Sequence, residues 1–116
     1  MIKNIIFLIS LLIMTHSQTL FAHGGGHGPI SEKRAIEVAT STVNQFVQFD
    51  SGLGFGKLNK SWNAIPTAEK RIHRKGDGYY IVSSTNNNEG KTLYVLMSIS
   101  GEVYDANFSG EFKGLK

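Results

Sequence analysis

The sequence contains no cysteine, only two prolines, and no apolar run long enough to cross a membrane. Without cysteine the chain has neither disulfide bonds nor a thiol that could act as a nucleophile or a soft metal ligand. Its stability must therefore come from a packed core alone. Two prolines are also too few for a proline-rich linker.

The chain also lacks a strong charge of one sign. Its net charge is +3 over 116 residues, and the densest basic group is Lys70, Arg71, Arg74 and Lys75, which flank one turn. A solvated edge strand accounts for such a group, because lysine and arginine are common on sheet edges. No aromatic-rich basic motif accompanies these residues, so we expect no nucleic-acid partner.

Residues 1–22 have the layout of a secretory signal peptide. Lys3 precedes an almost wholly apolar segment at 5–14, a polar patch follows at 15–19, and the small residue Ala22 marks the expected cleavage site. The apolar core of about ten residues is short of the roughly 20 that a membrane span needs. An uncleaved anchor, or a cut at another position, is the alternative. We expect a periplasmic or secreted protein with no stable membrane insertion after cleavage.

Residues 23–30 form a His/Gly-rich segment that we expect to be flexible, because ordering so many glycines is entropically costly. A helix of about 18 residues should follow, with Ser31 as N-cap and a left-handed Gly52 after its end. Its core-facing positions recur at helical spacing: Ile36, Ala39, Val43, Phe46 and Val47.

The segment after the helix alternates glycine with large apolar residues. It fails as a phosphate loop, because Ser51 stands where the first glycine should be and Leu58 replaces the Ser or Thr that binds magnesium. We expect instead a tight connection in which Leu53, Phe55 and Leu58 enter the core. Trp62 should cover one end of the sheet.

Four β-type runs at 69–74, 79–85, 91–99 and 102–108 are separated by turn residues. Leu93, Val95, Met97 and Ile99 alternate on one face of the third run, which should be a central strand. Residues 31–116 are therefore predicted to form one α+β domain, in which an N-terminal helix packs on a four-stranded antiparallel meander.

Sequence motifs in this order resemble those of PepSY domains: a helix, a tryptophan-bearing linker, Tyr-Tyr-Ile-Val at 79–82, Leu-Tyr-Val-Leu-Met at 93–97 and Ser-Gly-Glu-Val-Tyr-Asp at 100–105. The long Gly-rich link departs from that pattern. PepSY domains are associated with inhibiting or assisting exported peptidases and with binding, so the resemblance implies a non-catalytic module.

Residues 23–116 also resemble a family of small, uncharacterised exported bacterial proteins. The resemblance is carried by the His/Gly-rich start with Gly-Pro-Ile-Ser at 28–31, Gly-Leu-Gly-Phe-Gly-Lys-Leu at 52–58, and Gly-Glu-Val-Tyr-Asp-Ala-Asn-Phe-Ser-Gly-Glu-Phe at 101–112. That family has no established activity.

His23 and His27 are the candidate metal ligands. Cleavage after Ala22 would give His23 a free α-amino group, and three glycines would let His27 approach as a further nitrogen ligand. Nitrogen ligands of this kind suit copper, nickel or zinc. The alternative is a disordered N-terminus whose histidines bind nothing specific. A divalent metal ion is thus one expected partner.

The remaining candidate residues do not indicate an enzyme active site. His73 lies among cations and is expected to be a surface histidine, and Glu102, Asp105 and Glu111 fit a solvated edge better than a pair of catalytic acids. Strand alternation predicts that the Asp105 and Val103 side chains lie on the same face of the sheet. The four tyrosines and Trp62 fit sheet packing better than a binding surface. The sequence thus predicts a non-enzymatic exported binding protein that handles a divalent transition metal through its His-rich N-terminus. The alternative is a protein-interaction module that binds or inhibits an exported enzyme through a sheet edge or face.

Overall fold

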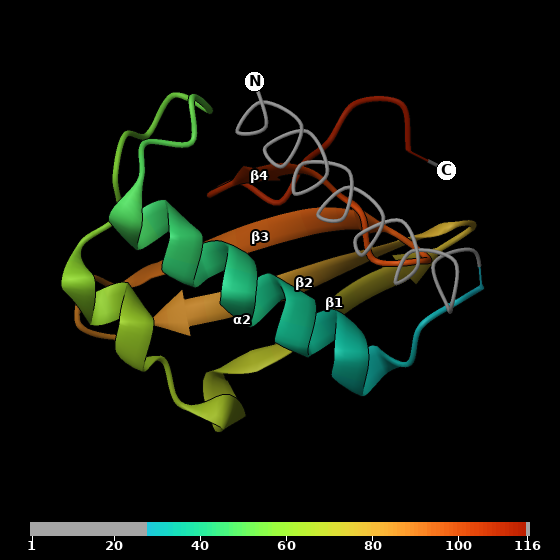
Figure 1. The fold of residues 1–116 in the computed structure, drawn as a ribbon, viewed down its shortest axis with the longest axis horizontal. Helices are drawn as coiled ribbons and strands as arrows, with labels where there is room; N and C mark the ends of the chain where they lie inside the picture. Colours follow the sequence, from blue (N-terminus) through green and yellow to red (C-terminus); the bar gives the residue numbers. More distant parts are fainter. Residues whose placement is uncertain (1–27, 116) are drawn as a thin grey trace, which may run out of the picture.

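The computed structural model describes residues 28–115, in which one helix packs on a four-stranded sheet (Figure 1). The signal-like segment and both N-terminal histidines, His23 and His27, lie outside the described residues. The elements in chain order are helix α2 (Glu32–Gln48), the 3-10 turns η1 (Lys60–Ala64) and η2 (Thr67–Glu69), and strands β1 (Lys70–Gly76), β2 (Tyr79–Asn86), β3 (Lys91–Ser98) and β4 (Val103–Asn107).

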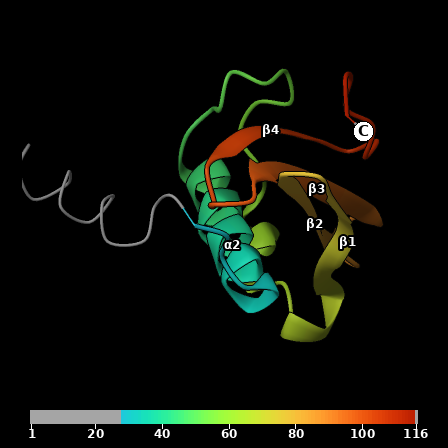
Figure 2. The same ribbon diagram turned by 90° about the vertical axis from the view of Figure 1, so that its right-hand side faces the viewer.

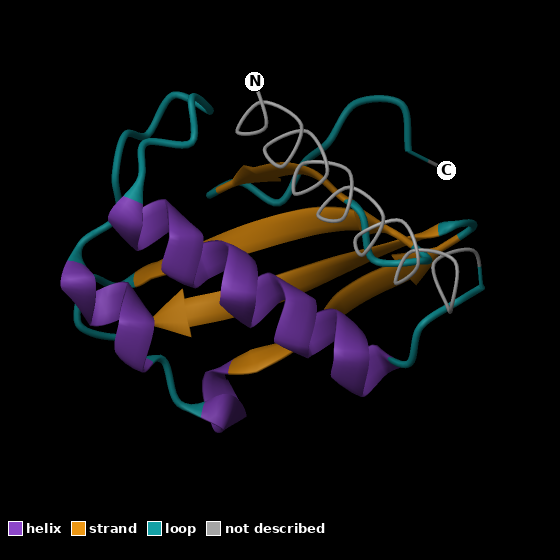
Figure 3. Ribbon diagram, in the orientation of Figure 1, coloured by secondary structure: helices purple, strands orange, loops and turns teal. Residues whose placement is uncertain are grey.

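Each strand pairs antiparallel with the next, in the order β1-β2-β3-β4, and short loops join them (Figure 3). Figure 2 shows α2 on one side of this sheet and the C-terminal segment on the other. The predicted α+β fold, with a helix on an antiparallel meander, is confirmed.

Helix α2 begins where its capping residue predicts. The Ser31 hydroxyl accepts a hydrogen bond from the Arg34 backbone N–H at 3.0 Å, which satisfies one of the donors left free at a helix start. The last helical residue is Gln48, and Gly52 adopts a positive φ of 79° shortly afterwards. The predicted helix end and its left-handed glycine are therefore close to those observed.

The buried face of α2 is rotated slightly from the predicted one. Ala35, Ala39, Val43 and Phe46 are buried together with Thr42, whose hydroxyl donates to the Val38 carbonyl at 2.8 Å. Two residues assigned to the core from spacing, Ile36 and Val47, lie at its margin and are half-buried.

The sheet buries apolar side chains on both faces. Leu93, Val95 and Met97 are each 0% exposed on the helix side, as their alternation predicts. On the other side a smaller group forms the outer cluster, in which the C-terminal residues Phe112 and Leu115 pack over three strand residues: Tyr79, Ile81 and Leu96. A strand with apolar residues on both faces belongs in the middle of a sheet, and β3 is there.

The linker between α2 and η1 enters the core at two of its three predicted positions. Leu58 is buried, and the Phe55 ring packs edge-on against Phe46 and Phe108 at centroid distances of 5.6 and 5.4 Å. The prediction for Leu53 was wrong, because its side chain is 41% exposed. Positive φ angles at the glycines on either side of it turn the chain outward there.

Trp62 closes one end of the sheet, as predicted. Its side chain is 2% exposed, and its indole N–H donates to a Glu89 carboxylate oxygen at 3.1 Å. Its ring also lies 6.0 Å from that of Phe108, measured between centroids. The indole thereby joins the end of β4 to the loop between β2 and β3.

Strand β4 contains a bulge that the sequence pattern did not predict. Leu96 pairs with Asp105, but the next residue, Met97, pairs with Val103, which leaves Tyr104 as the extra residue. Paired residues share a face, so Val103 lies on the helix side and Asp105 on the opposite side. The expectation that these two share a face was wrong, because strict alternation holds only without a bulge.

The chain enters the domain at Ile30, which two hydrogen bonds hold to the sheet. The Ile30 N–H donates to the Ile99 carbonyl at 2.9 Å, and the buried Tyr80 hydroxyl donates to the Ile30 carbonyl at 2.7 Å. Ile30 is therefore held at a fixed point beside the sheet.

Replacing Tyr80 by phenylalanine should loosen this tether. Loss of the hydroxyl leaves the Ile30 carbonyl without its donor, so we expect a destabilisation of about 1–2 kcal/mol. Hydrogen exchange at the Ile30 amide should become faster, as measured by NMR. Tyr104→Phe is the matched control, because Tyr104 is 61% exposed. Equal exchange rates at Ile30 in the two variants would contradict the tether.

Candidate binding site

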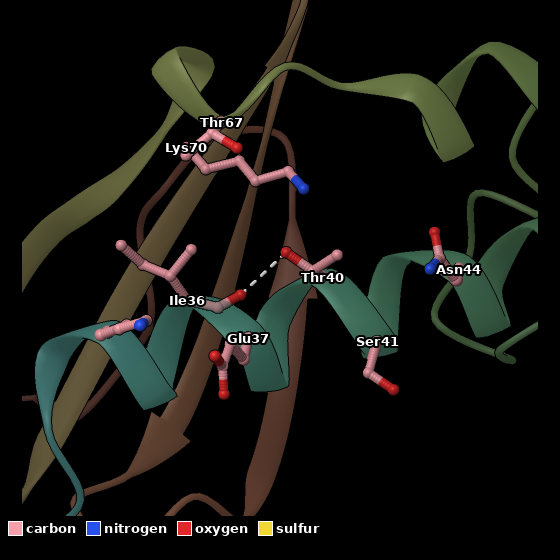
Figure 4. A pocket seen from close by; sticks show the side chains of 8 residues that line it. Ile36, Glu37, Thr40, Ser41, Asn44, Thr67 and Lys70 are labelled. Atoms are coloured by element: carbon pink, nitrogen blue, oxygen red, sulfur yellow. Dashed lines mark hydrogen bonds between the residues drawn. The ribbon is translucent and has the colours of Figure 1, made fainter.

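A groove of about 580 Å³ lies between α2 and the start of β1 and is termed here the α2–β1 groove. Figure 4 shows Ile36, Thr40 and Asn44 along the helix, with Thr67 and Lys70 facing them from the η2–β1 junction. The complete lining is Lys33, Ile36, Glu37, Thr40, Ser41, Asn44, Thr67 and Lys70. Its exposed surface is more apolar than polar, which suits a peptide or another apolar ligand.

Most of the polar groups of this groove lie on α2. The Thr40 hydroxyl donates to the Ile36 carbonyl at 2.9 Å, so its proton is committed within the helix. The one carboxylate of the lining, Glu37, forms an ion pair with Arg34 at 3.2 Å. The arrangement can hold a ligand by apolar contact and by the charges of Lys33, Glu37 and Lys70.

Strand β1 borders the groove and forms one edge of the sheet. Within residues 28–115 it is paired with β2 alone, so its outer row of backbone groups faces away from the sheet. It carries the basic group found in the sequence, with no acidic residue among them. The one ion pair in this described part of the chain joins Arg34 to Glu37 on the helix, at 3.2 Å.

Two of the β1 cations are positioned by aromatic rings. The Arg74 guanidinium lies 5.7 Å from the Tyr79 ring centroid, and the Lys75 ammonium lies 5.6 Å from that of Tyr80. Cation–π contacts of this kind hold a charge in place but do not neutralise it. These groups therefore remain able to donate hydrogen bonds to an anionic partner.

His73 is exposed on β1, as predicted, at the register shift between Ile72 and Arg74. Its ring packs edge-on against Tyr94, with centroids 4.8 Å apart. Tyr94 lines the outer cluster, which places His73 on the side of the sheet that faces away from α2. It does not line the α2–β1 groove.

The tyrosines serve mainly in packing. Tyr79 and Tyr80 are buried and Tyr94 is half-buried, as predicted from their strand positions, whereas Tyr104 on the bulge is exposed. Tyr79 and Tyr94 lie on the sheet face away from the helix, where the C-terminal segment covers them. The aromatic residues therefore do not form one open surface.

The carboxylates of β4 and its surroundings do not gather into a site. The Asp105 carboxylate accepts a hydrogen bond from the backbone N–H of Ala106 at 2.8 Å, while Glu102 and Glu111 are exposed. Within residues 28–115 no group of three or more His, Cys, Asp or Glu side chains could hold a metal ion. The prediction for His23 and His27 falls outside this range and stays a prediction.

Sequence reasoning missed the α2–β1 groove because periodicity assigned its residues to other roles. Ile36 was predicted to lie in the core, whereas it lines the groove together with Asn44. The sequence signal that could have revealed the groove is the row Ile36, Thr40 and Asn44. These residues are spaced four apart, so they lie along one side of the helix beside its core-facing positions.

A second groove of about 420 Å³ lies between α2 and Val103 of β4. No helix in the described range is both long and apolar enough to cross a membrane.

Comparison with known proteins identifies a protein family that matches the chain. A model described as a family of unknown function (DUF6488) matches residues 1–111. Neither the curated proteins nor the solved structures give a match. The match spans the signal-like segment and nearly all of the domain. It does not test the resemblance to PepSY domains, which stays a prediction.

Proposed function

Because the chain belongs to the DUF6488 family, whose function is unknown, we propose a role from its own surfaces. The protein is a non-enzymatic, exported binding module that holds an extended segment of another exported protein in the α2–β1 groove. The observation that supports this most is the position of an apolar groove directly beside an unpaired strand edge. Inhibition or assistance of an exported peptidase, as in the PepSY domains that the chain resembles, would be one form of such binding.

The groove is built for binding without rearrangement. One wall is α2, which is held to the sheet by Ala35, Ala39 and Val43, all at most 2% exposed. The other wall is the η2–β1 junction, where the Glu69 N–H donates to the Pro66 carbonyl at 2.9 Å. A preformed site loses little entropy when it binds a ligand, which favours affinity even for a small contact area.

Site-specific photo-cross-linking in the exporting cell tests this proposal. A photoreactive amino acid at Ser41 or Thr67, both exposed in the groove, should give the same protein adduct. The same amino acid at Asn63, which is exposed on η1 outside the groove, is the control. Thr40→Trp, whose side chain would extend from α2 toward Thr67 and Lys70, should abolish the adduct formed at Thr67. Equal adducts at the groove and control positions would overturn the proposal.

A second candidate function is the binding of copper, nickel or zinc through His23 and His27. The specific observation in its favour is the tether at Ile30, which would keep a metal held by these residues close to the domain. The free amine of a mature N-terminus at His23 would supply the strongest donor, together with the two imidazoles.

Titration with Cu(II) should perturb the histidine NMR signals of His23 and His27 at one equivalent of metal. His73 provides an internal control, because its ring packs against Tyr94 away from any acidic cluster in residues 28–115. His27→Ala should weaken binding by about tenfold or more, the loss expected for one nitrogen ligand. Unchanged His23 and His27 signals would rule the metal out. Mass spectrometry of the mature N-terminus decides whether His23 carries the amine.

A further inference from the structure

We propose that β1 accepts an acidic, extended segment as a fifth strand, whose alternate side chains enter the α2–β1 groove. This inference rests on the proposed binding function and names the chemistry of its partner. The partner is an exported protein segment in which glutamate or aspartate alternates with aliphatic residues.

The backbone of β1 provides the first part of the argument. In residues 28–115 its outer edge has no paired strand, and an edge of this kind presents N–H and C=O groups to any extended chain beside it. Peptides commonly bind in this way, with backbone bonds supplying affinity and side-chain pockets supplying specificity. The register shift at His73 limits the regular pairing to the two ends of the strand.

The charges of β1 lie on both faces of this edge. Paired residues lie on the same face of a sheet. Lys70 pairs with Ser84, which pairs with the core residue Leu93, so Lys70 lies on the helix side. Lys75 pairs with the core residue Tyr80 and therefore also lies on the helix side. Arg71 and Arg74 occupy intervening register positions on the opposite side. An added strand that turns its aliphatic side chains toward α2 therefore presents its acidic side chains to Arg71 and Arg74 on the opposite face, since its side chains alternate.

This charge pattern selects the partner. Opposite charges directly across two strands contribute about 0.2–1 kcal/mol per pair, whereas like charges destabilise the pairing. A second copy of β1 would place cation against cation, so the edge rejects its own kind. The one ion pair within residues 28–115 lies on α2. In this range no carboxylate is paired with the β1 cations, so an incoming acidic side chain would not have to displace one.

The groove explains why aliphatic residues should alternate with the acids. A strand beside β1 directs every second side chain toward α2, and the space there is lined by Ile36, Thr40 and Thr67. Aliphatic side chains at these positions would be removed from water against the Ile36 side chain and the Thr40 methyl group. Burial of this kind stabilises by about 25 cal/mol per Å² of apolar surface.

The test uses the ¹⁵N-labelled purified protein and two end-capped heptapeptides. One alternates glutamate with valine, and the other alternates lysine with valine. We expect the acidic peptide alone to shift the β1 amide signals and those of Ile36 and Thr40. The affinity should fall by about tenfold or more when salt is raised from low to high concentration, because surface charges are screened.

A charge-reversed double variant, Arg71→Glu with Arg74→Glu, should lose most of the binding. The matched control is Lys57→Glu with Lys60→Glu, which makes the same change in net charge at exposed positions before β1. The NMR spectrum of each free variant reports whether its fold is intact. Equal loss in both variants would overturn the inference, because net charge alone would then explain binding.

Other outcomes separate the inference from the proposed function. Equal shifts with both peptides, confined to α2 and Thr67, would overturn the acidic fifth strand and leave the groove as a binding site. Shifts of β1 with phosphatidylglycerol vesicles but with neither peptide would assign the edge to an anionic membrane surface and overturn it. Absence of peptide shifts would overturn the inference alone if cross-links at Ser41 and Thr67 persist, and both proposals if they do not.

Discussion

Val95→Asp is expected to abolish folding. Val95 is 0% exposed at the centre of β3, where it pairs with Val82 on one side and Ala106 on the other. A carboxylate there would have neither water nor an opposite charge, and burial of an unpaired polar or charged group costs several kcal/mol. Small domains are stable by only about 5–15 kcal/mol, and this one has no disulfide to limit the loss.

The measurements are thermal unfolding by circular dichroism and the dispersion of the amide NMR spectrum. Val95→Asp should show no cooperative transition and a collapsed spectrum. The matched control is Val103→Asp, the same chemical change on β4, where the side chain is 39% exposed. That variant should retain a cooperative transition. A cooperative melt of Val95→Asp close to that of the wild type would refute the assignment of Val95 to the core.

The second large effect is expected at Gly76, the last residue of β1. A Cβ atom at this position would fall inside contact distance of the Tyr79 ring, which crosses over the glycine at the start of β2. Tyr79 is 5% exposed and belongs to the outer cluster, so its ring has little room to move. Gly76→Ala should therefore destabilise the domain by about 2–3 kcal/mol, which is typical of overpacking in a tight site.

Urea unfolding would measure this change. Gly28→Ala is the matched control, because a Cβ atom at Gly28 meets nothing within 4 Å among the described residues. In a Tyr79→Ala background the cost of Gly76→Ala should nearly vanish, because the ring that causes the clash is gone. A cost that persists in that background would mean that the effect comes from the backbone and not from Tyr79.

Much of the fold follows from local sequence signals. Ser31 marks the helix start, glycine-rich turns separate the strands, and alternation at Leu93, Val95 and Met97 identifies the central strand and its core face. These signals work because capping and strand alternation depend on neighbours only a few residues apart. The order of the strands follows because short turns join antiparallel neighbours.

Other features depend on how distant segments meet, and sequence reasoning missed them. The bulge at Tyr104 changes the face of Asp105, and no local residue pattern announces it. The outward turn that exposes Leu53 depends on glycine conformations that an apolar pattern cannot specify. The α2–β1 groove lies between Ile36 on α2 and Thr67 just before β1, which are far apart in the sequence, so no local pattern reveals it.

The outer cluster affects the order in which the two faces of the sheet become covered during folding. Its cover, Phe112 and Leu115, follows all four strands in the sequence. Helix α2 and the strands can assemble one side of the sheet earlier, but Tyr79, Ile81 and Leu96 lack their covering residues until the segment after β4 has packed over them. Up to that moment the nascent domain presents an apolar surface on which chaperones can act.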